Sequence, residues 1–408
     1  MRVFAYTGVC VAALMLSASA HAQERLTLKQ AFDIAWTRQP EARAADLRRS
    51  AVEARRDAAG NWLVAQPNVE LATKTDRVNR NDGSREYEVG VGLPLWLPGE
   101  RSRAQALADA DVDALKSRQL ATQLRLAANV RAAWWAAVQA DGEQQLAQAR
   151  LKLAEQLAGD VARRVRAGDL ARADQHQADG AVATAQAQLA EAQSVTAQTK
   201  QRLRGLLGMA PTVPSEVAPE ALPALSTSID EAQHPALREI ADRAESARRA
   251  KALASTQTRN NPQLLLATTR DRSTFSTPYA QTVTVGVRIP FGADNRRQAG
   301  IANAEAEAVE AEARLSLEQE TVLADIEAAR ARVTASEAQR TAAERRAVLA
   351  RETRGFFDKS FRLGESDLPT RLRVELESYE AERQLAKSRI AVAQAISQYR
   401  QALGLLPE

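Results

Sequence analysis

Residues 86–95 read EYEVGVGLPL, and residues 282–291 read TVTVGVRIPF. In both runs apolar side chains alternate with polar residues or glycine, so each run has one apolar face. An apolar face opposite a polar face over about ten residues is typical of a strand in a transmembrane barrel, with lipid on one side and water on the other. A half-buried strand of a soluble sheet shows the same alternation, and both interpretations stay open here.

The two runs belong to an internal repeat, because the second begins 196 positions after the first. Other landmarks keep this spacing or one of 195: Gln66-Pro67 returns as Asn261-Pro262, and Gly168 returns as Gly364. A repeat of this length indicates a duplicated domain and not a solenoid of short units. We therefore divide the chain into a signal peptide (residues 1–22), a first repeat (23–210), a proline-rich linker (211–229) and a second repeat (230–408).

Each repeat has the same predicted plan: a helical segment, two strands and a long region broken once by glycine, at Gly168 or Gly364. The helical segments are expected at residues 27–59 and 235–258. The long regions are rich in alanine and carry apolar residues seven and four positions apart, which is typical of packed long helices. A helix over residues 103–165 would be about 90 Å long and must pack against a partner of similar length.

The N-terminus has the pattern of a secretory signal peptide. Arg2 precedes an apolar run over residues 3–16, and Ala20-His21-Ala22 forms a cleavage site. The run contains Cys10, the only cysteine, without the residues that precede the modified cysteine of a lipoprotein. We therefore predict a mature protein that is not lipidated and has no disulfide framework.

The composition argues against several classes of protein. The chain has 55 basic and 51 acidic residues, and their interspersion indicates a solvated helical surface and no nucleic-acid partner. The mature histidines, His176 and His234, lie far apart, so neither a metal site nor a cofactor is expected. No catalytic triad, paired carboxylates or nucleotide-binding loop is recognisable, and the sequence predicts no enzyme.

No stretch after residue 22 has the ~20 consecutive apolar residues that a membrane-spanning helix needs. A membrane-spanning form would therefore be a closed barrel, which satisfies every backbone polar group. Four strands per chain are too few, since about eight strands are needed to close a barrel. Either several chains share one barrel, or the strands form a soluble sheet.

The signal peptide, the duplicated halves, the paired strands and the glycine-broken helical regions together resemble the TolC family of outer-membrane efflux proteins, the outer membrane factors. The resemblance covers nearly the whole mature chain. Its landmarks in chain order are Leu28-Lys29-Gln30-Ala31, Gln39-Pro40, Gly90 to Leu95 with Gly99-Glu100-Arg101, Arg166-Ala167-Gly168, Leu206-Leu207-Gly208, Arg362 to Ser366 and Ala402-Leu403-Gly404. The run from Trp96 to Arg101 and the short chain look most like the CzcC-like branch.

The resemblance implies a mainly helical chain with transmembrane β-strands, assembled as a homotrimer in the outer membrane of a Gram-negative bacterium and in contact with its lipid. Four strands from each chain would close a 12-stranded β-barrel, and twelve coiled-coil helices would continue it as an α-helical tunnel in the periplasm. The hairpin tips would dock on a periplasmic adaptor, or membrane fusion, protein. That adaptor would link the duct to an inner-membrane pump of the resistance-nodulation-division (RND) type.

The candidate functional residues form three groups, none catalytic or metal-binding. The adaptor-docking tips comprise Arg166, Gly168, Arg362, Gly364, Glu365 and Ser366, although both glycines also fit plain helix caps. The candidate barrel strands are represented by Tyr87, Val89, Val91, Val283, Val285 and Val287. The candidate pore constriction comprises Asp174, Asp367, Thr370 and Arg373. Well-known family members carry aspartates at the last two positions, so threonine and arginine here argue against a constriction held by aspartate rings.

The sequence therefore favours a passive efflux duct that depends on a pump for energy. The alternative is a periplasmic coiled-coil structural or adaptor protein without a channel. The CzcC-like turn favours heavy-metal cations over organic compounds as cargo, by family analogy alone, because the sequence shows no metal ligands.

Overall fold

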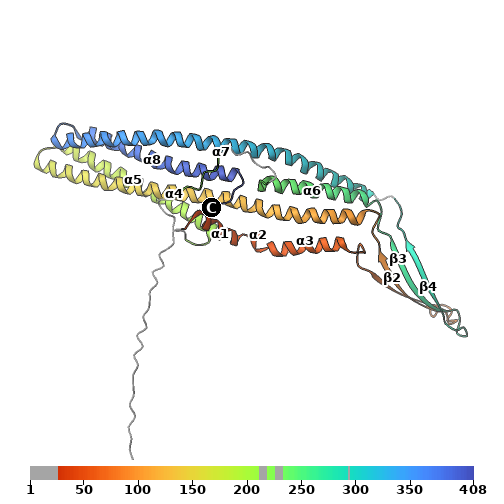
Figure 1. Cartoon of the computed structure of the whole chain (residues 1–408). Coiled ribbons are helices and arrows are strands. Elements are labelled where there is room, and N and C mark those ends of the chain that lie inside the picture. Colours follow the sequence, from red (N-terminus) through yellow and green to blue (C-terminus); the bar gives the residue numbers. More distant parts are fainter. Residues whose placement is uncertain (1–25, 211–217, 226–232, 293–294) are drawn as a thin grey trace, which may run out of the picture.

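A computed structural model describes residues 26–210, 218–225, 233–292 and 295–408. The predicted signal peptide and its Cys10 lie outside the described residues, as do parts of the predicted linker. The described chain is an elongated bundle of helices with one four-stranded sheet at one end (Figure 1). The prediction of a mainly helical chain with four strands is confirmed.

The N-terminal helical region is broken where one continuous segment was predicted. It consists of α1 (Leu28–Arg38), α2 (Pro40–Arg43) and α3 (Ala45–Gly60). The break follows from Pro40, which disfavours helical backbone at the preceding residue. Gln39 accordingly has extended backbone angles, with φ −66° and ψ 138°.

The first pair of strands leads directly into the first long hairpin. β1 (Asn68–Thr75) and β2 (Arg85–Pro94) precede α4 (Glu100–Ala167) and α5 (Arg172–Leu207). At 68 residues, α4 is about 100 Å long, so the sequence predicted its scale correctly.

The second half repeats this order of elements. α6 (Pro235–Thr256) takes the place of the three N-terminal helices, and β3 (Gln263–Arg272) and β4 (Ala280–Arg288) follow it. The second hairpin consists of α7 (Asn295–Leu363) and α8 (Leu368–Ala402).

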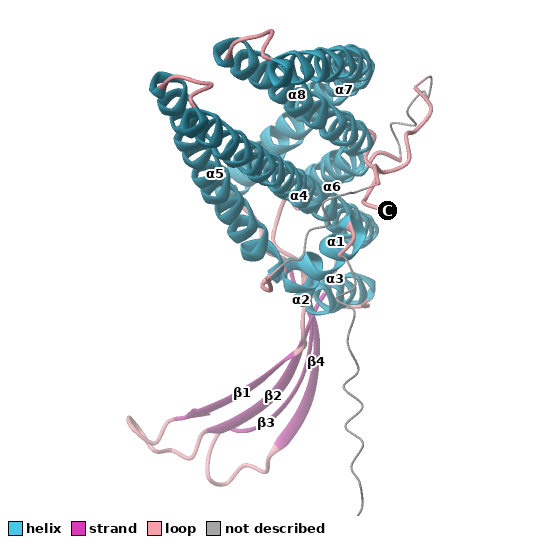
Figure 2. Cartoon of the chain, turned by 90° about the vertical axis from the view of Figure 1, so that its left-hand side faces the viewer, coloured by secondary structure: helices cyan, strands magenta, loops and turns pink. Residues whose placement is uncertain are grey.

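The helices pack lengthwise, and the sheet and the hairpin tips lie at opposite ends of the bundle. α4 packs along α5, α7 packs along α8, and α6 contacts both α4 and α7. Figure 2 shows the sheet curving away from the helices. Within the described residues, no helix is both long enough and apolar enough to cross a membrane.

The largest core lies where α1 crosses the middle of the bundle. Its residues Leu28, Ala31, Phe32 and Ala35 share one helical face and pack against Trp134 and Trp135 of α4. A capping box starts the helix: the backbone N–H of Gln30 donates to Oγ1 of Thr27 at 3.2 Å, and the Thr27 N–H donates to Oε1 of Gln30 at 2.8 Å.

Candidate functional site

The sheet aligns the apolar residues of all four strands on one face. The strands are antiparallel in the order β1-β2-β3-β4, and residues directly opposite each other in such a sheet point to the same side. One row across the sheet consists of Val69, Val91, Leu266 and Val285, and the next contains Leu71, Val89, Thr268 and Val283. These apolar side chains are exposed, from 36% at Val91 to 75% at Leu71 and Val283.

The opposite face of the sheet is polar and contains small residues. Its rows include Glu70, Gly90, Ala267 and Thr284, then Ala72, Glu88, Thr269 and Thr282. Four carboxylates lie on this face, those of Glu70, Glu86, Glu88 and Asp271, and two basic side chains, those of Lys74 and Arg288. Nζ of Lys74 pairs with Glu86 at 2.8 Å, and this pair leaves three carboxylates and one basic side chain on the face. The polar face is therefore acidic.

The turn between β2 and α4 is a structural joint. Gly99 adopts a left-handed conformation, with φ 77°, and Glu100 after it is fully buried. The Glu100 carboxylate accepts hydrogen bonds from the Leu97 N–H at 2.9 Å and from the Gln257 amide at 2.9 Å. This turn, which carries the CzcC-like resemblance, ties β2 to α6 and the start of α4 and shows no ligand chemistry of its own.

Both predicted tip glycines end long helices with left-handed backbone. Gly168 follows α4 with φ 86°, and Gly364 follows α7 with φ 80°. Only glycine adopts such angles without strain, which explains why the chain reverses at these positions. Arg166, Arg362 and Glu365 are exposed, and Ser366 is half-buried. The tips thus present two exposed arginines beside the turns, and their docking role stays a prediction.

The two tips of one chain are joined through the ring of Phe361 in α7. The Arg164 guanidinium lies 5.1 Å from the ring centroid and the Arg371 guanidinium 4.9 Å. Arg164 also donates to the backbone carbonyls of Phe361 and Arg362, both at 3.2 Å. These carbonyls lie in the last turn of α7, so an arginine of α4 caps a helix of the other hairpin.

The candidate pore residues make local helix contacts in the single chain. Asp174 accepts a hydrogen bond from the Ala171 N–H at 3.0 Å, and Asp367 caps α8 by accepting from the Thr370 N–H at 3.1 Å. Hydrogen bonds from Thr370 hold the pKa of Asp367 below its ordinary value. Arg373 pairs with Glu377 at 3.2 Å on an exposed face. These contacts explain the residues as helix caps and surface charges, and their pore role stays a prediction.

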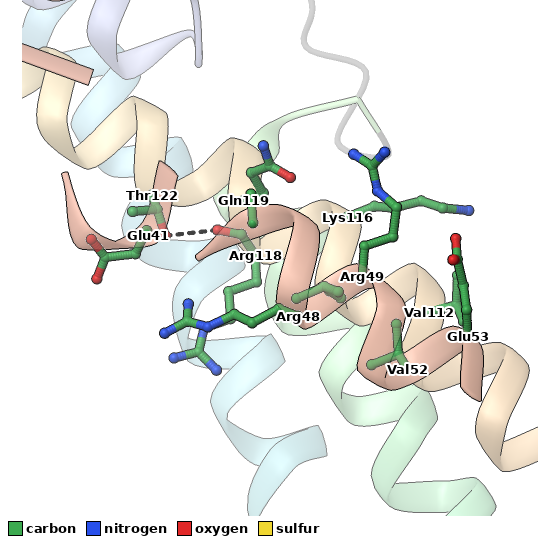
Figure 3. A pocket seen from close by; sticks show the side chains of 12 residues that line it. Glu41, Arg48, Arg49, Val52, Glu53, Val112, Lys116, Arg118, Gln119 and Thr122 are labelled. Atoms are coloured by element: carbon green, nitrogen blue, oxygen red, sulfur yellow. Dashed lines mark hydrogen bonds between the residues drawn. The ribbon is translucent and has the colours of Figure 1, made fainter. Parts of the chain in front are cut away.

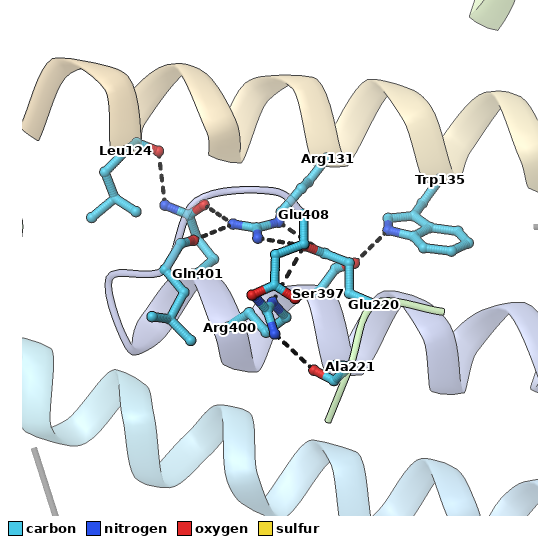
Figure 4. Close-up of polar contacts among 10 residues, drawn as sticks. Leu124, Arg131, Trp135, Glu220, Ala221, Ser397, Arg400, Gln401 and Glu408 are labelled. Atoms are coloured by element: carbon cyan, nitrogen blue, oxygen red, sulfur yellow. Dashed lines mark hydrogen bonds and ion pairs between the residues drawn. The ribbon is translucent and has the colours of Figure 1, made fainter. Parts of the chain in front are cut away.

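A buried polar cluster that the sequence did not predict anchors the linker to both halves (Figure 4). The Glu220 carboxylate accepts two hydrogen bonds from Arg131 of α4, at 2.7 and 3.1 Å. It also lies 3.4 Å from Nε of Arg400 in α8 and accepts from the Ser397 hydroxyl. All three charged side chains are only 4% exposed.

Further hydrogen bonds complete this cluster around its two arginines. Arg131 donates to the Gln401 side chain at 2.7 Å and to the Leu405 carbonyl at 2.9 Å, and Arg400 donates to the Ala221 carbonyl at 2.9 Å. The Trp135 indole donates to the Ser397 hydroxyl at 2.8 Å. No motif marks these residues, because Glu220 lies 89 positions from Arg131 and 180 from Arg400.

A small hollow of about 90 Å³ lies between α3 and α4 (Figure 3). Its lining mixes basic side chains, such as Arg48 and Lys116, with the acidic Glu41 and Glu53 and with apolar residues. The hollow lies along the contact between two helices, and its polar side chains do not converge on one point. Within the described ranges, no group of three or more His, Cys, Asp or Glu side chains is placed to hold a metal ion.

Comparisons with known proteins agree with this geometry. Residues 32–209 match the sequence profile of the family described as outer membrane efflux protein. The sequence matches no curated protein sequence significantly.

Several solved structures share the fold over more than nine-tenths of this chain. The outer membrane protein VceC from Vibrio cholerae is 17% identical, with a TM-score of 0.75, and the match covers 93% of this chain and 97% of that chain. The CmeC outer membrane channel of Campylobacter jejuni is 14% identical, with a TM-score of 0.75 and coverages of 92% and 85%. The open state of the Neisseria gonorrhoeae MtrE outer membrane channel is 19% identical, with a TM-score of 0.72 and coverages of 93% and 89%. The chain therefore has the fold of these outer-membrane channels, and its residues 32–209 match the profile of the outer membrane efflux protein family.

Proposed function

We propose that this protein is the outer-membrane channel subunit of a tripartite efflux system and acts as a passive exit duct. The observation that carries the proposal is the set of apolar rows that cross all four strands on one exposed face of the sheet. Exposing such an apolar face to water is energetically unfavourable, and a face of this kind suits the lipid-facing side of a barrel. The family match and the fold of the solved channels support the same function.

The sheet is incomplete in a single chain, which supports a homotrimer. β1 and β4 are the edges of the sheet, and each leaves one row of backbone groups without a strand partner in the described chain. Unpaired edges of this kind are templates for pairing with another chain. Three copies joined through β4 and β1 would form a closed barrel of twelve strands, enough to enclose a lumen with the acidic face inside.

The partners are proposed from the opposite end of the molecule. The tips lie far from the sheet and present Arg166 and Arg362 to solvent (Figure 1). We propose that they dock on a periplasmic adaptor that connects the duct to an inner-membrane pump of the RND type. Alanine at both positions should weaken adaptor crosslinking, whereas Arg163→Ala, an exposed arginine paired with Asp160 on the same helix, should not. Undiminished crosslinking in the double variant would show that the tip arginines are not needed for docking.

The proposed cargo is a cation, in the first instance a heavy-metal ion. The acidic polar face supports this proposal, because a lumen lined by carboxylates raises the local concentration of cations. The CzcC-like branch stays a prediction, since its turn is a structural joint. Deletion of the gene should sensitise cells to zinc, cobalt or cadmium more than to dyes and detergents. The reverse ranking would reject the metal cargo and leave the duct intact.

The proposed membrane position is tested by lysine on neighbouring residues of β4. Val285 is 68% exposed on the apolar face, and Thr284 is exposed on the polar face. In a lipid-facing sheet, Val285→Lys should cost about 2–4 kcal/mol and reduce recovery of assembled protein from the outer membrane. Thr284→Lys would face the lumen and should be tolerated.

The same pair of variants discriminates the alternative function. In a periplasmic coiled-coil structural or adaptor protein, both positions would face water, so both lysines should be harmless. Equal tolerance of the two variants, together with recovery of the wild-type chain from the soluble periplasmic fraction, would reject the channel.

A further inference from the structure

Two arginines and two tyrosines border the apolar rows of the sheet on the side of the strand-connecting loops. The register places Tyr87 opposite Arg270, on the same face as the apolar rows and one row nearer the loops. Arg272 is two residues further along β3 and therefore points to this face as well. The apolar face thus ends in a basic and aromatic edge.

Ring contacts hold both guanidinium groups in place. The Arg270 guanidinium lies 4.9 Å from the centroid of the Tyr279 ring, and the Arg272 guanidinium lies 4.9 Å from the same ring. Arg272 also lies 5.4 Å from the Phe275 ring and donates through Nε to the Gly83 carbonyl at 3.0 Å. The Tyr87 and Tyr279 rings are 6.4 Å apart. Stacking on aromatic rings fixes a guanidinium at little entropic cost and leaves its edge N–H groups available.

The charge of these two arginines is not balanced locally. Arg85, which lies opposite Arg272, is neutralised by Asp76 at 2.8 Å. Asp271 points to the polar face of the sheet, because successive residues of a strand alternate. In the part of the chain that the structure describes, neither Arg270 nor Arg272 forms an ion pair with a carboxylate. Two uncompensated positive charges therefore lie at the edge of an apolar surface.

We propose that Arg270 and Arg272, with Tyr87 and Tyr279, bind the phosphate of a lipid headgroup at the loop-side boundary of the membrane. The planar fork of arginine matches the oxygens of a phosphate, and tyrosine suits a boundary that is apolar on one side and wet on the other. The adjoining apolar rows would hold the acyl chains of the same lipid, which a free phosphate lacks. The inference rests on the proposed function, because it requires the sheet to lie in a bilayer.

The experiment measures lipid selectivity at the protein surface. Purified full-length protein is reconstituted into phosphatidylcholine vesicles that contain trace spin-labelled phosphatidic acid or spin-labelled phosphatidylcholine, and electron paramagnetic resonance gives the motionally restricted fraction of each. Each arginine near an anionic headgroup favours binding of that lipid over a zwitterionic one by about fivefold. The measured fraction averages over all lipids around the sheet, so we expect a preference for phosphatidic acid over phosphatidylcholine of about twofold or more. The variant Arg270→Gln with Arg272→Gln should lose most of this preference. The matched control is Arg77→Gln with Arg80→Gln in the β1–β2 loop, which also removes two positive charges but lies outside the ring contacts, and this variant should keep the preference.

The outcomes separate this inference from the proposed function. Absence of a restricted fraction for both lipids would mean that the protein is not embedded, which would reject the proposed function and with it the lipid site. A restricted fraction without preference for phosphatidic acid would reject the lipid site alone. A preference that survives in the doubly substituted variant would also reject the lipid site. A preference that added inorganic phosphate abolishes would reject it too, because the site would then recognise free phosphate and not a lipid.

Discussion

The buried cluster around Glu220 makes a strong prediction about stability. In Glu220→Gln the side chain keeps its size but loses its charge, so Arg131 remains buried at 4% exposure without a carboxylate partner, whereas Arg400 keeps an ion pair with the exposed Glu408 at 2.5 Å. The amide group also replaces one of the two oxygens that accept from Arg131, at 2.7 and 3.1 Å, with an N–H donor. Removing one partner of a buried ion pair typically costs about 3–5 kcal/mol, because an uncompensated charge stays in the interior. We expect a loss of about 3 kcal/mol or more in the free energy of unfolding.

The assay is denaturant unfolding followed by tryptophan fluorescence, for which the cluster contains its own reporter. The Trp135 indole donates to Ser397, which in turn donates to Glu220, so the emission of this residue should respond to loss of the cluster. The matched control is Glu239→Gln, which removes a carboxylate paired with Arg125 at 2.9 Å on the surface, where the arginine side chain is 60% exposed.

The control pair is expected to be worth no more than about 1 kcal/mol, as exposed ion pairs usually are. The two variants should therefore differ by about 2 kcal/mol or more. Equal losses in Glu220→Gln and Glu239→Gln would refute the reasoning, because they would show that the Glu220 site is hydrated or rearranges at little cost.

Three further predictions concern local features. Burial lowers the pKa of His234 and outweighs its hydrogen bond to the Ala402 carbonyl. The stability contributed by the neutral imidazole is therefore present above about pH 6.5 and lost as the pH falls through the folded pKa. Unfolding midpoints measured above and below this pH should differ less in His234→Gln than in the wild type. Gly168→Ala should lower the free energy of unfolding by about 1 kcal/mol, because the φ of Gly168 is 86°. Gly180→Ala within α5 should raise it by up to about 1 kcal/mol. Shifts of Tm in the same direction for both variants would contradict the left-handed conformation at Gly168. Thr27→Ala removes the capping box and should cost about 1 kcal/mol, and an unchanged Tm would show that α1 is held by its core contacts alone.

The sequence predicted the features that depend on local pattern. Alternation in residues 86–95 and 282–291 located β2 and β4, and the alanine-rich composition predicted a helix over residues 103–165, close to the observed bounds of α4, Glu100–Ala167. Gly168 and Gly364 were recognisable as reversal points because a left-handed residue at a helix end favours glycine. The N-terminal helices were predicted as one segment, and Pro40 was the signal that could have corrected this.

Only the tertiary structure decided which residues from distant parts of the chain meet. The pairing of β2 with β3 joins the two halves and sets the register that places Tyr87 beside Arg270, and a shift of one residue would turn those side chains to the other face. Likewise Glu220, Arg131 and Arg400 come together only when the linker lies across α4 and α8. The physical reason is the range of the interactions. Helix propensity and strand alternation act over a few residues and can be read along the chain, whereas register and buried charge pairing depend on contacts between segments that the chain brings together only by folding.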